Sequence, residues 1–331
     1  MMEDAARLLY QNAPTDVPVV VCNAYPDSLL YDLKTSALIQ DDRTQALKLL
    51  QMNLDVENEL DGEHQHILLL PHKQTQQSAA WMAKAILALE EGGTLTMCCA
   101  NKMGARGYQK RLTQLAGMDA HCVSKNKCRL FHVKRTDKMD VDLAQSWLKS
   151  GSLQWVEGLD LFSSPGLFSW NRADKGSELL LKHVPKDLSG VGMDVGCGNG
   201  ILSASLLKRN QGIKELYLYD SSWPAIKAAQ KNAVAPEGVD VHVHHLDAVH
   251  EAFHVKPNWI VLNPPFHHGQ QQDTELGQDM IVKCCKAIKR GGTLYMVANR
   301  HLPYEQILSE HASSWTELAA AQGFKVLRAE K

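Results

Sequence analysis

The stretch Met193-Asp194-Val195-Gly196-Cys197-Gly198-Asn199-Gly200 joins an apolar run to a segment with helical spacing. Residues 191–195 are typical of a buried strand, and apolar side chains then recur at helical intervals over residues 201–209. A glycine-rich loop between a strand and a helix lies at the carboxyl end of an α/β sheet, where such proteins bind ligands. The stretch therefore predicts an α/β fold and the place of a ligand site.

The composition of this loop indicates which ligand it binds. A side chain at Gly196 or Gly198 would keep a cofactor from lying against the backbone. The loop does not match a dinucleotide site, because the third glycine of that fingerprint would fall at Ile201, and it lacks the Gly-Lys-Ser/Thr of a phosphate loop. Asp194, two residues before the first glycine, suits a cation. We predict S-adenosylmethionine as the cofactor, its ammonium group bound by Asp194 directly or through water.

The C-terminal half of the chain alternates strand and helix patterns. Helices are expected at residues 201–209, 224–234 and 279–289, and strands at residues 191–195, 216–219, 239–244, 259–262, 293–297 and 324–328. Such alternation predicts a doubly wound, parallel sheet.

Two carboxylates follow strands of this predicted sheet. Asp220 comes twenty residues after Gly200, at the end of residues 216–219, where it can accept both hydroxyls of a ribose. Asp247 follows the third strand and is placed to accept from an adenine amino group. The alternative for each aspartate is a loop or helix-cap role.

A second motif, Asn263-Pro264-Pro265-Phe266, directly follows residues 259–262. Two consecutive prolines end a strand and stiffen the backbone, so the Asn263 side chain and the Pro264 carbonyl become fixed acceptors. Two fixed acceptors suit the exocyclic amine of a base, whose lone pair they would point at a cofactor methyl group, while Phe266 stacks on the ring. The alternative is a structural Pro-Pro turn.

One segment of the chain is repeated. Residues 88–97, Ala-Leu-Glu-Glu-Gly-Gly-Thr-Leu-Thr-Met, resemble residues 287–296, Ala-Ile-Lys-Arg-Gly-Gly-Thr-Leu-Tyr-Met, at an offset of 199. In both copies we expect Gly-Gly to stop a helix and Thr-Leu to begin a strand. A short apolar run ending in proline precedes each copy, at residues 67–71 and 259–265. The repeat predicts two halves of one architecture, of which only the second keeps a glycine-rich loop.

Length and composition exclude several classes of protein. The chain has 331 residues, 44% apolar and 22% charged, which excludes a disordered or fibrous chain. No apolar run approaches the roughly 18 residues that span a bilayer, and the first residues are acidic, so we expect a cytoplasmic protein. The eight cysteines contain no Cys-x-x-Cys pair, which predicts neither a zinc site nor disulfides. We expect no metal.

Charge is distributed unevenly along the sequence. Residues 1–63 carry 4 Lys/Arg against 12 Asp/Glu, whereas residues 101–138 carry 10 against 2. A chain with a net charge of −2 therefore has a strongly basic stretch, which is typical of a surface that binds nucleic acid.

The two motifs together resemble those of class I S-adenosylmethionine-dependent amino-methyltransferases. With residues 165–169, Pro-Gly-Leu-Phe-Ser, the following Lys175-Gly176-Ser177, and residues 297–304, Val-Ala-Asn-Arg-His-Leu-Pro-Tyr, the sequence is similar to the bacterial ribosomal RNA guanine-N2 methyltransferases. It most resembles the small-subunit branch of that family, with the large-subunit branch close behind. The resemblance extends from about residue 125 to the C-terminus and is poor over the first hundred residues.

This resemblance implies an α/β fold of two tandem Rossmann-like methyltransferase domains. Residues 1–150 would form a degenerate domain with an RNA-docking or structural role, and residues 151–331 a catalytic domain around a doubly wound, mostly parallel seven-stranded sheet. The catalytic residues would be Asn263, Pro264, Pro265 and Phe266. The cofactor-binding residues would be Phe168, Asp194, Gly196, Cys197, Gly198, Gly200, Asp220, Ser221, Asp247, Ala248 and Asn263.

The implied reaction is methyl transfer from S-adenosylmethionine to the N2 amine of a guanine in small-subunit ribosomal RNA, in the assembled subunit, by a monomer. Three alternatives remain at this point: a guanine of the large-subunit RNA, adenine N6, or a protein glutamine amide. A binding module that has lost activity is disfavoured by the intact glycine loop.

Overall fold

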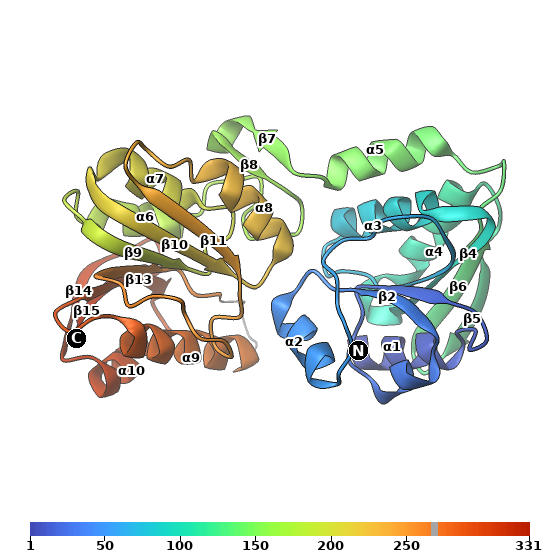
Figure 1. The fold of residues 1–331 in the computed structure, drawn as a ribbon, viewed down its shortest axis with the longest axis horizontal. Coiled ribbons are helices and arrows are strands. Elements are labelled where there is room, and N and C mark those ends of the chain that lie inside the picture. Colours follow the sequence, from blue (N-terminus) through green and yellow to red (C-terminus); the bar gives the residue numbers. More distant parts are fainter. Residues whose placement is uncertain (266–270) are drawn as a thin grey trace. The chain divides into compact units, whose positions relative to one another are not determined.

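A computed structural model describes residues 1–265 and 271–331; the side chains of residues 271–273 are not described. The chain divides into two compact units, Met1–Ser152 and Leu153–Lys331. Each unit has its own sheet with helices on both faces (Figure 1).

The N-terminal unit contains a six-stranded sheet in the order β2-β1-β3-β4-β6-β5. Helices α1 and α2 and the short η1 pack on one face, and α3, α4 and α5 on the other. Its strands are β1 (Val19–Cys22), β2 (Thr35–Ile39), β3 (His64–Leu69), β4 (Leu89–Ala100), β5 (His121–Lys125) and β6 (Cys128–Lys134). Its helices are α1 (Met2–Gln11), η1 (Ser28–Asp32), α2 (Arg43–Gln51), α3 (Thr75–Leu87), η2 (Asn101–Met103), α4 (Ala105–Ala116) and α5 (Val141–Gly151).

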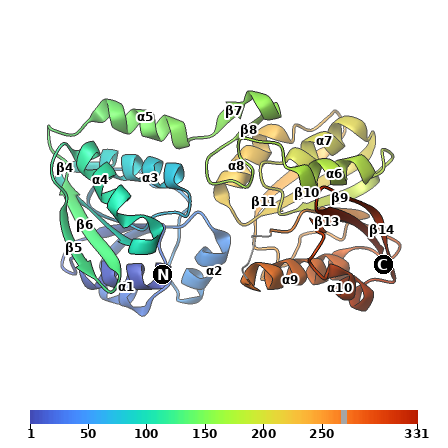
Figure 2. The same ribbon diagram turned by 180° about the vertical axis from the view of Figure 1, so that it is seen from behind.

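The C-terminal unit contains a seven-stranded sheet in the order β11-β10-β9-β12-β13-β15-β14 and a small β7-β8 hairpin. Helices α6, α7 and α8 cover one face of the larger sheet, and α9 and α10 the other, as the two views show (Figures 1 and 2). The strands are β7 (Gln154–Val156), β8 (Leu161–Ser163), β9 (Ser189–Val195), β10 (Gly212–Asp220), β11 (Asp240–His245), β12 (Trp259–Leu262), β13 (Thr293–Asn299), β14 (Ser314–Ala321) and β15 (Phe324–Glu330). The helices are η3 (Glu157–Leu159), α6 (Lys175–His183), α7 (Ile201–Arg209), α8 (Trp223–Asn232), α9 (Gln271–Ala287) and α10 (Tyr304–His311).

The two sheets share one topology. The order β2-β1-β3-β4-β6-β5 matches β10-β9-β12-β13-β15-β14. In each sheet one strand, β6 or β15, runs antiparallel to both of its neighbours. The register agrees as well, because Ile67 pairs with Leu95 as Ile260 pairs with Leu294. The predicted fold class is confirmed: two α/β sheets, the second seven-stranded and mostly parallel. The N-terminal sheet lacks the counterpart of β11.

The first Gly-Gly pair has the expected positive φ, +78° at Gly92, but it lies within the span of a strand instead of directly before one. Helix α3 ends at Leu87, and β4 begins at Leu89, so Gly92 and Gly93 lie inside a strand. Both are hydrogen-bonded to Arg135, and a Cβ on Gly93 would come within 3.0 Å of the Gln65 carbonyl oxygen. A Cβ on Gly92 would meet nothing within 4 Å, so only Gly93 is needed for close backbone approach. The register of β3 with β4 shifts between His64 and His66, so the pair lies in an irregular step of the strand.

The second copy forms the expected turn, with Gly291 at φ +77° before β13. The helix before it, α9, spans Gln271–Ala287 instead of residues 279–289. It ends early because the Lys289 N–H bonds to the Pro257 carbonyl oxygen, at 3.0 Å. No described helix is long and apolar enough to cross a membrane.

Candidate active site

The glycine loop follows β9 and is held against β10. The N–H groups of Gly196 and Cys197 both donate to the Tyr219 carbonyl oxygen, at 2.8 and 3.0 Å. Gly196, Gly198 and Gly200 have φ of +70°, +55° and +79°, which glycine adopts without strain.

The glycines serve different purposes. A Cβ on Gly200 would lie 3.1 Å from the Cα of Ala229, so this glycine lets α8 pack against the loop. A Cβ on Gly198 would meet nothing within 4 Å, which leaves space beside the backbone for a ligand. Cys197 is buried, and burial raises the pKa of its thiol well above the usual value. It is therefore an uncharged part of the loop.

Asp194 is fully buried beneath this loop. Its Oδ2 accepts a hydrogen bond from the Ser203 hydroxyl at 2.6 Å, whereas Oδ1 is buried with no hydrogen-bond partner among the described residues. Burial raises the pKa of the carboxyl group to about 7. A buried carboxylate oxygen without a partner fits a cationic group such as the ammonium of S-adenosylmethionine.

Asp220 ends β10 beside the glycine loop. Its Oδ2 accepts from the Gly198 N–H at 2.8 Å, and its Oδ1 from the Ser222 N–H, also at 2.8 Å. The Ser221 carbonyl bonds the His245 ring, at 2.9 Å. The structure thus bonds Asp220 to the glycine loop and Ser221 to the last residue of β11.

Asp247 is buried after β11 and caps a turn. Its Oδ1 accepts from the N–H groups of Val249 and His250, at 2.8 and 3.0 Å, and its Oδ2 contacts the His250 ring at 2.9 Å. This geometry shows the cap role weighed from the sequence, and any contact to an adenine would add to it. Ala248 follows in the same turn and packs against the core beneath the sheet.

Asn263 directly follows β12, next to the glycine loop. Leu262 pairs with Val195, so the register places Asn263 beside Gly196. The Asn263 Nδ2 donates to Asp174 Oδ2 and to Ser177 Oγ, each at 2.9 Å. Its Oδ1 is buried and has no hydrogen-bond partner in the described part of the chain.

The other predicted site residues have different surroundings. Pro264 is buried and Pro265 exposed. Phe266 lies outside the described residues. Phe168, in the loop after β8, has 54% of its surface exposed.

Sequence reasoning missed Asp174, which precedes α6. Its Oδ2 also accepts from the Ser177 N–H, at 2.7 Å, and so caps the helix. The spacing of an aspartate three residues before a helical N–H is a recognisable cap signal. The contact to Asn263, 89 residues away in sequence, has no such signal.

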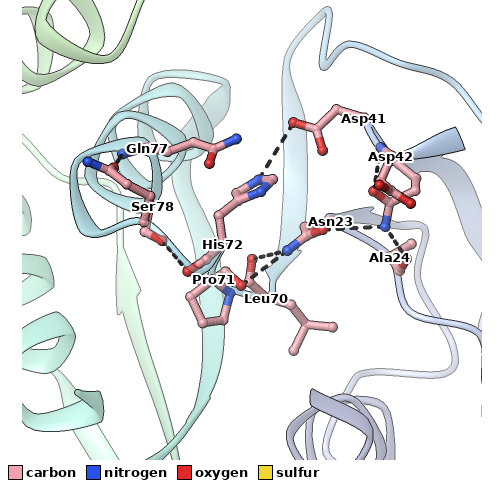
Figure 3. A network of polar contacts seen from close by, with 11 residues as sticks. Asn23, Ala24, Asp41, Asp42, Leu70, Pro71, His72, Gln77 and Ser78 are labelled. Atoms are coloured by element: carbon pink, nitrogen blue, oxygen red, sulfur yellow. Dashed lines mark hydrogen bonds and ion pairs between the residues drawn. The ribbon is translucent and has the colours of Figure 1, made fainter. Parts of the chain in front are cut away.

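The equivalent edge of the N-terminal unit is filled by its own side chains (Figure 3). By register, Gln40 occupies the place of Asp220, and Leu70 that of Asn263. The Gln40 Nε2 donates to the Ala24 carbonyl at 2.7 Å and to Asn23 Oδ1 at 3.3 Å, and its Oε1 accepts from the Asp42 N–H. Asn23 in turn donates to the Leu70 and Pro71 carbonyls. With η1 in place of a glycine loop and helix, this edge lacks the features of a cofactor site.

Comparison with known proteins agrees with this geometry. Residues 158–328 match the family model of the methyltransferase small domain. A ribosomal RNA small subunit methyltransferase C from Pseudomonas entomophila is 30% identical over 80% of this chain and 78% of the relative. The protein of that name from Hahella chejuensis is 38% identical over 53% of this chain, but only half of the relative is covered. The one from Salmonella paratyphi B is 34% identical over 69% of this chain and 64% of the relative.

A solved structure matches both units of this chain. A T. thermophilus 16S rRNA N2 methyltransferase, solved in complex with AdoMet and guanosine, has a TM-score of 0.81 and 21% identity. The match covers 99% of this chain and 92% of the other. At this identity the likeness supports the fold. The relatives above and the family model confirm the family expected from the sequence: the chain belongs to the ribosomal RNA small subunit methyltransferase C family.

Proposed function

We propose that the C-terminal unit transfers a methyl group from S-adenosylmethionine to the N2 amine of a guanine in small-subunit ribosomal RNA. One observation carries this proposal: the Asn263 Oδ1 is a buried acceptor without a partner among the described residues, directly beside the glycine loop. Such an acceptor is suited to an exocyclic amine, because it can bind an N–H of that group and hold it in place.

The cofactor would be held by residues of the loop and the strand ends. Gly198 leaves the backbone accessible, Gly196 and Gly200 shape the same loop, Asp194 offers its unpartnered Oδ1, and Asp220 supplies carboxylate oxygens for the ribose. When bound, S-adenosylmethionine supplies an electrophilic methyl group. We assign Phe168, Cys197, Ser221, Asp247 and Ala248 to the same site from the sequence.

The residues after β12 would prepare the amine. Asn263 Oδ1 and the Pro264 carbonyl each accept one hydrogen of N2, which turns the nitrogen lone pair away from the ring. Phe266, on sequence grounds, stacks on the base. No strong base is needed, because the methylated nitrogen loses its proton readily to water. Pro264 and Pro265 keep the two acceptors from moving.

The N-terminal unit would dock the RNA. Its basic residues at 102–138 form no ion pair within the described chain. Arg129 and Arg135 donate to groups of the unit itself, and the exposed lysines among the others would contact phosphates. The relatives are named for small-subunit RNA. We propose that the chain acts as a monomer in the cytoplasm, on the assembled small subunit.

The test is transfer of labelled methyl groups to purified ribosomal particles, followed by nucleoside analysis. We expect N2-methylguanosine in small-subunit particles that lack this modification. Label in large-subunit RNA, on adenine N6 or in protein would favour one of the alternative substrates instead. Protein-free small-subunit RNA, assayed in parallel, distinguishes recognition of the assembled particle from recognition of the RNA.

A further inference from the structure

The amide of Asn263 can face its site in two ways, related by a rotation of 180° about its last side-chain bond. In one, Oδ1 points into the site and can accept from an amine. In the other, the NH2 group points into the site, where its N–H donors would face the N–H donors of the substrate amine. The proposed reaction requires the first orientation.

We propose that Asp174 is the positioning residue that fixes this orientation. The inference rests on the proposed function only for its catalytic consequence. Asp174 Oδ2 lies 2.9 Å from Asn263 Nδ2. An ionised carboxylate only accepts hydrogen bonds, so in the rotated state two acceptor oxygens would face each other at this distance.

Ser177 does not select between the two orientations of the Asn263 amide. Its hydroxyl accepts from Asn263 Nδ2 at 2.9 Å, but a hydroxyl can equally donate to an oxygen in the same place. Ser177 therefore supports either orientation of the amide, and only Asp174 discriminates between them. With both Nδ2 hydrogens directed to these two residues, Oδ1 is the atom left for the substrate.

The surroundings hold Asp174 in place. The same Oδ2 accepts from the Ser177 N–H at 2.7 Å and thereby caps α6. A Cβ on Gly176 would come within 3.2 Å of this oxygen and 3.3 Å of the Phe324 ring. Glycine at this position therefore lets the first turn of α6 lie close to β15, with the carboxylate directed at Asn263.

A second substitution that relieves a deliberate clash tests the proposal. Asn263→Asp places two carboxylates in contact, and we expect it to reduce kcat about a hundredfold and to lower the melting temperature. Adding Asp174→Ser relieves this contact, because a serine hydroxyl can accept from the Ser177 N–H and donate to the new carboxylate, whose other oxygen is left for the substrate. We expect the double variant to regain at least tenfold in kcat over Asn263→Asp and most of the lost melting temperature.

Single variants separate positioning from capping. Serine caps helices as well as aspartate does, and its hydroxyl can donate as well as accept, so Asp174→Ser keeps the cap but allows the amide to rotate. We expect kcat to fall about tenfold with the S-adenosylmethionine Kd unchanged, and Ser177→Ala to lose less. The matched control is Asp140→Ser, the same change at the cap of α5, where the aspartate bonds the Leu143 N–H; it should leave kcat unchanged.

The proposal is overturned if the double variant recovers neither rate nor melting temperature, or if Asp174→Ser is as active as the parent. Failure of the proposed function is a separate result. If the parent methylates another substrate, the ratios between variants still test Asp174 on that substrate. If the parent transfers no methyl group at all, recovery of the melting temperature decides, because it requires no substrate.

Discussion

Asp220 accepts a hydrogen bond from the backbone N–H of Gly198, with 2.8 Å between nitrogen and oxygen. Asp220, the last residue of β10, thus holds the glycine loop that follows the neighbouring strand β9. The carboxylate that we assign to the ribose and the glycine loop are therefore bonded to each other, which would preorganise the proposed cofactor site before any ligand binds.

Replacement of Gly198 tests whether the space beside this loop is the cofactor site. Gly198→Ala places a Cβ into open space at φ +55°, and Gly238→Ala, far away in sequence between α8 and β11, does the same at φ +77°. Each should cost about 1–2 kcal/mol of stability from the left-handed backbone alone. Only Gly198→Ala should weaken S-adenosylmethionine binding, by tenfold or more in calorimetry.

The same titrations count the sites. We expect one molecule of S-adenosylmethionine per chain, because Gln40 and Asn23 fill the corresponding edge of the N-terminal unit. A second site, or equal affinity in the two alanine variants, would contradict the assignment.

Cofactor binding should depend on pH through Asp194. Burial raises the pKa of this carboxyl group to about 7, and a cationic ligand binds its ionised form. The affinity for S-adenosylmethionine should therefore rise as pH increases from 6 to 8, with release of a proton near pH 7. In Asp194→Asn the affinity should be lower and should not change over this range. Calorimetry in buffers of different ionisation enthalpy measures the proton directly.

Asp194 should also affect stability. Its pKa is higher in the folded than in the unfolded protein, so between about pH 4 and pH 7 the folded state binds more protons. The contribution of Asp194 to the free energy of unfolding therefore falls as pH rises through this window. Asp194→Asn should remove that fall, and urea titrations of the cofactor-free protein at pH 5 and pH 7.5 would reveal it. An unchanged difference between the two pH values would show that Asp194 is ionised throughout.

Loss of the Asn263 oxygen should affect the chemical step more than cofactor binding. Asn263→Ala removes the acceptor that we assign to the substrate amine, and loss of one preorganised partner typically costs about a hundredfold or more in rate. The Kd of S-adenosylmethionine should stay within a few-fold. Single-turnover methyl transfer with saturating cofactor measures this step, and a fully active Asn263→Ala protein would exclude the assigned role.

The sequence predicted those parts of the fold that have a local signature. The glycine loop and the apolar strands around it were found because their patterns are periodic and lie between recognisable turns. Strand β14, at Ser314–Ala321, was missed because its residues are mostly exposed and do not alternate in polarity. Gly92 and Gly93 were expected before a strand, whereas β4 includes them, because a step within a strand and a turn before a strand use the same Gly-Gly pattern.

The residues of the candidate site were likewise predicted only where a local sequence pattern marks them. Asp194 and Asn263 were identified by their neighbours in sequence, but what their side chains contact depends on packing between distant elements. The cap formed by Asp247 is local, yet a cap and a ligand contact use the same residue type after the same strand. Asp174 reaches Asn263 only through the position of α6 against the sheet.

Reversal of charge on the N-terminal unit tests the proposed RNA surface. Lys110 lies on α4, and Lys125 and Lys127 lie on and beside the β5–β6 turn; all three are exposed. Helix and hairpin are joined by Arg129, whose Nη1 donates to the Gln109 side chain at 2.9 Å. Arg129 is best left intact, because its loss would loosen the surface as well as remove a charge.

The triple variant Lys110→Glu, Lys125→Glu, Lys127→Glu should bind small ribosomal subunits more weakly while its affinity for S-adenosylmethionine is unchanged. Each lost phosphate contact should reduce the slope of log K against log salt by about 0.7–0.9. The variant Lys186→Glu, Lys208→Glu, Lys214→Glu, at three exposed positions on the C-terminal unit, changes the net charge equally and provides the control. If the triple variant and this control bind alike at every salt concentration, the basic stretch is not the docking surface, and residues 299–304 beside the candidate active site become the next to test.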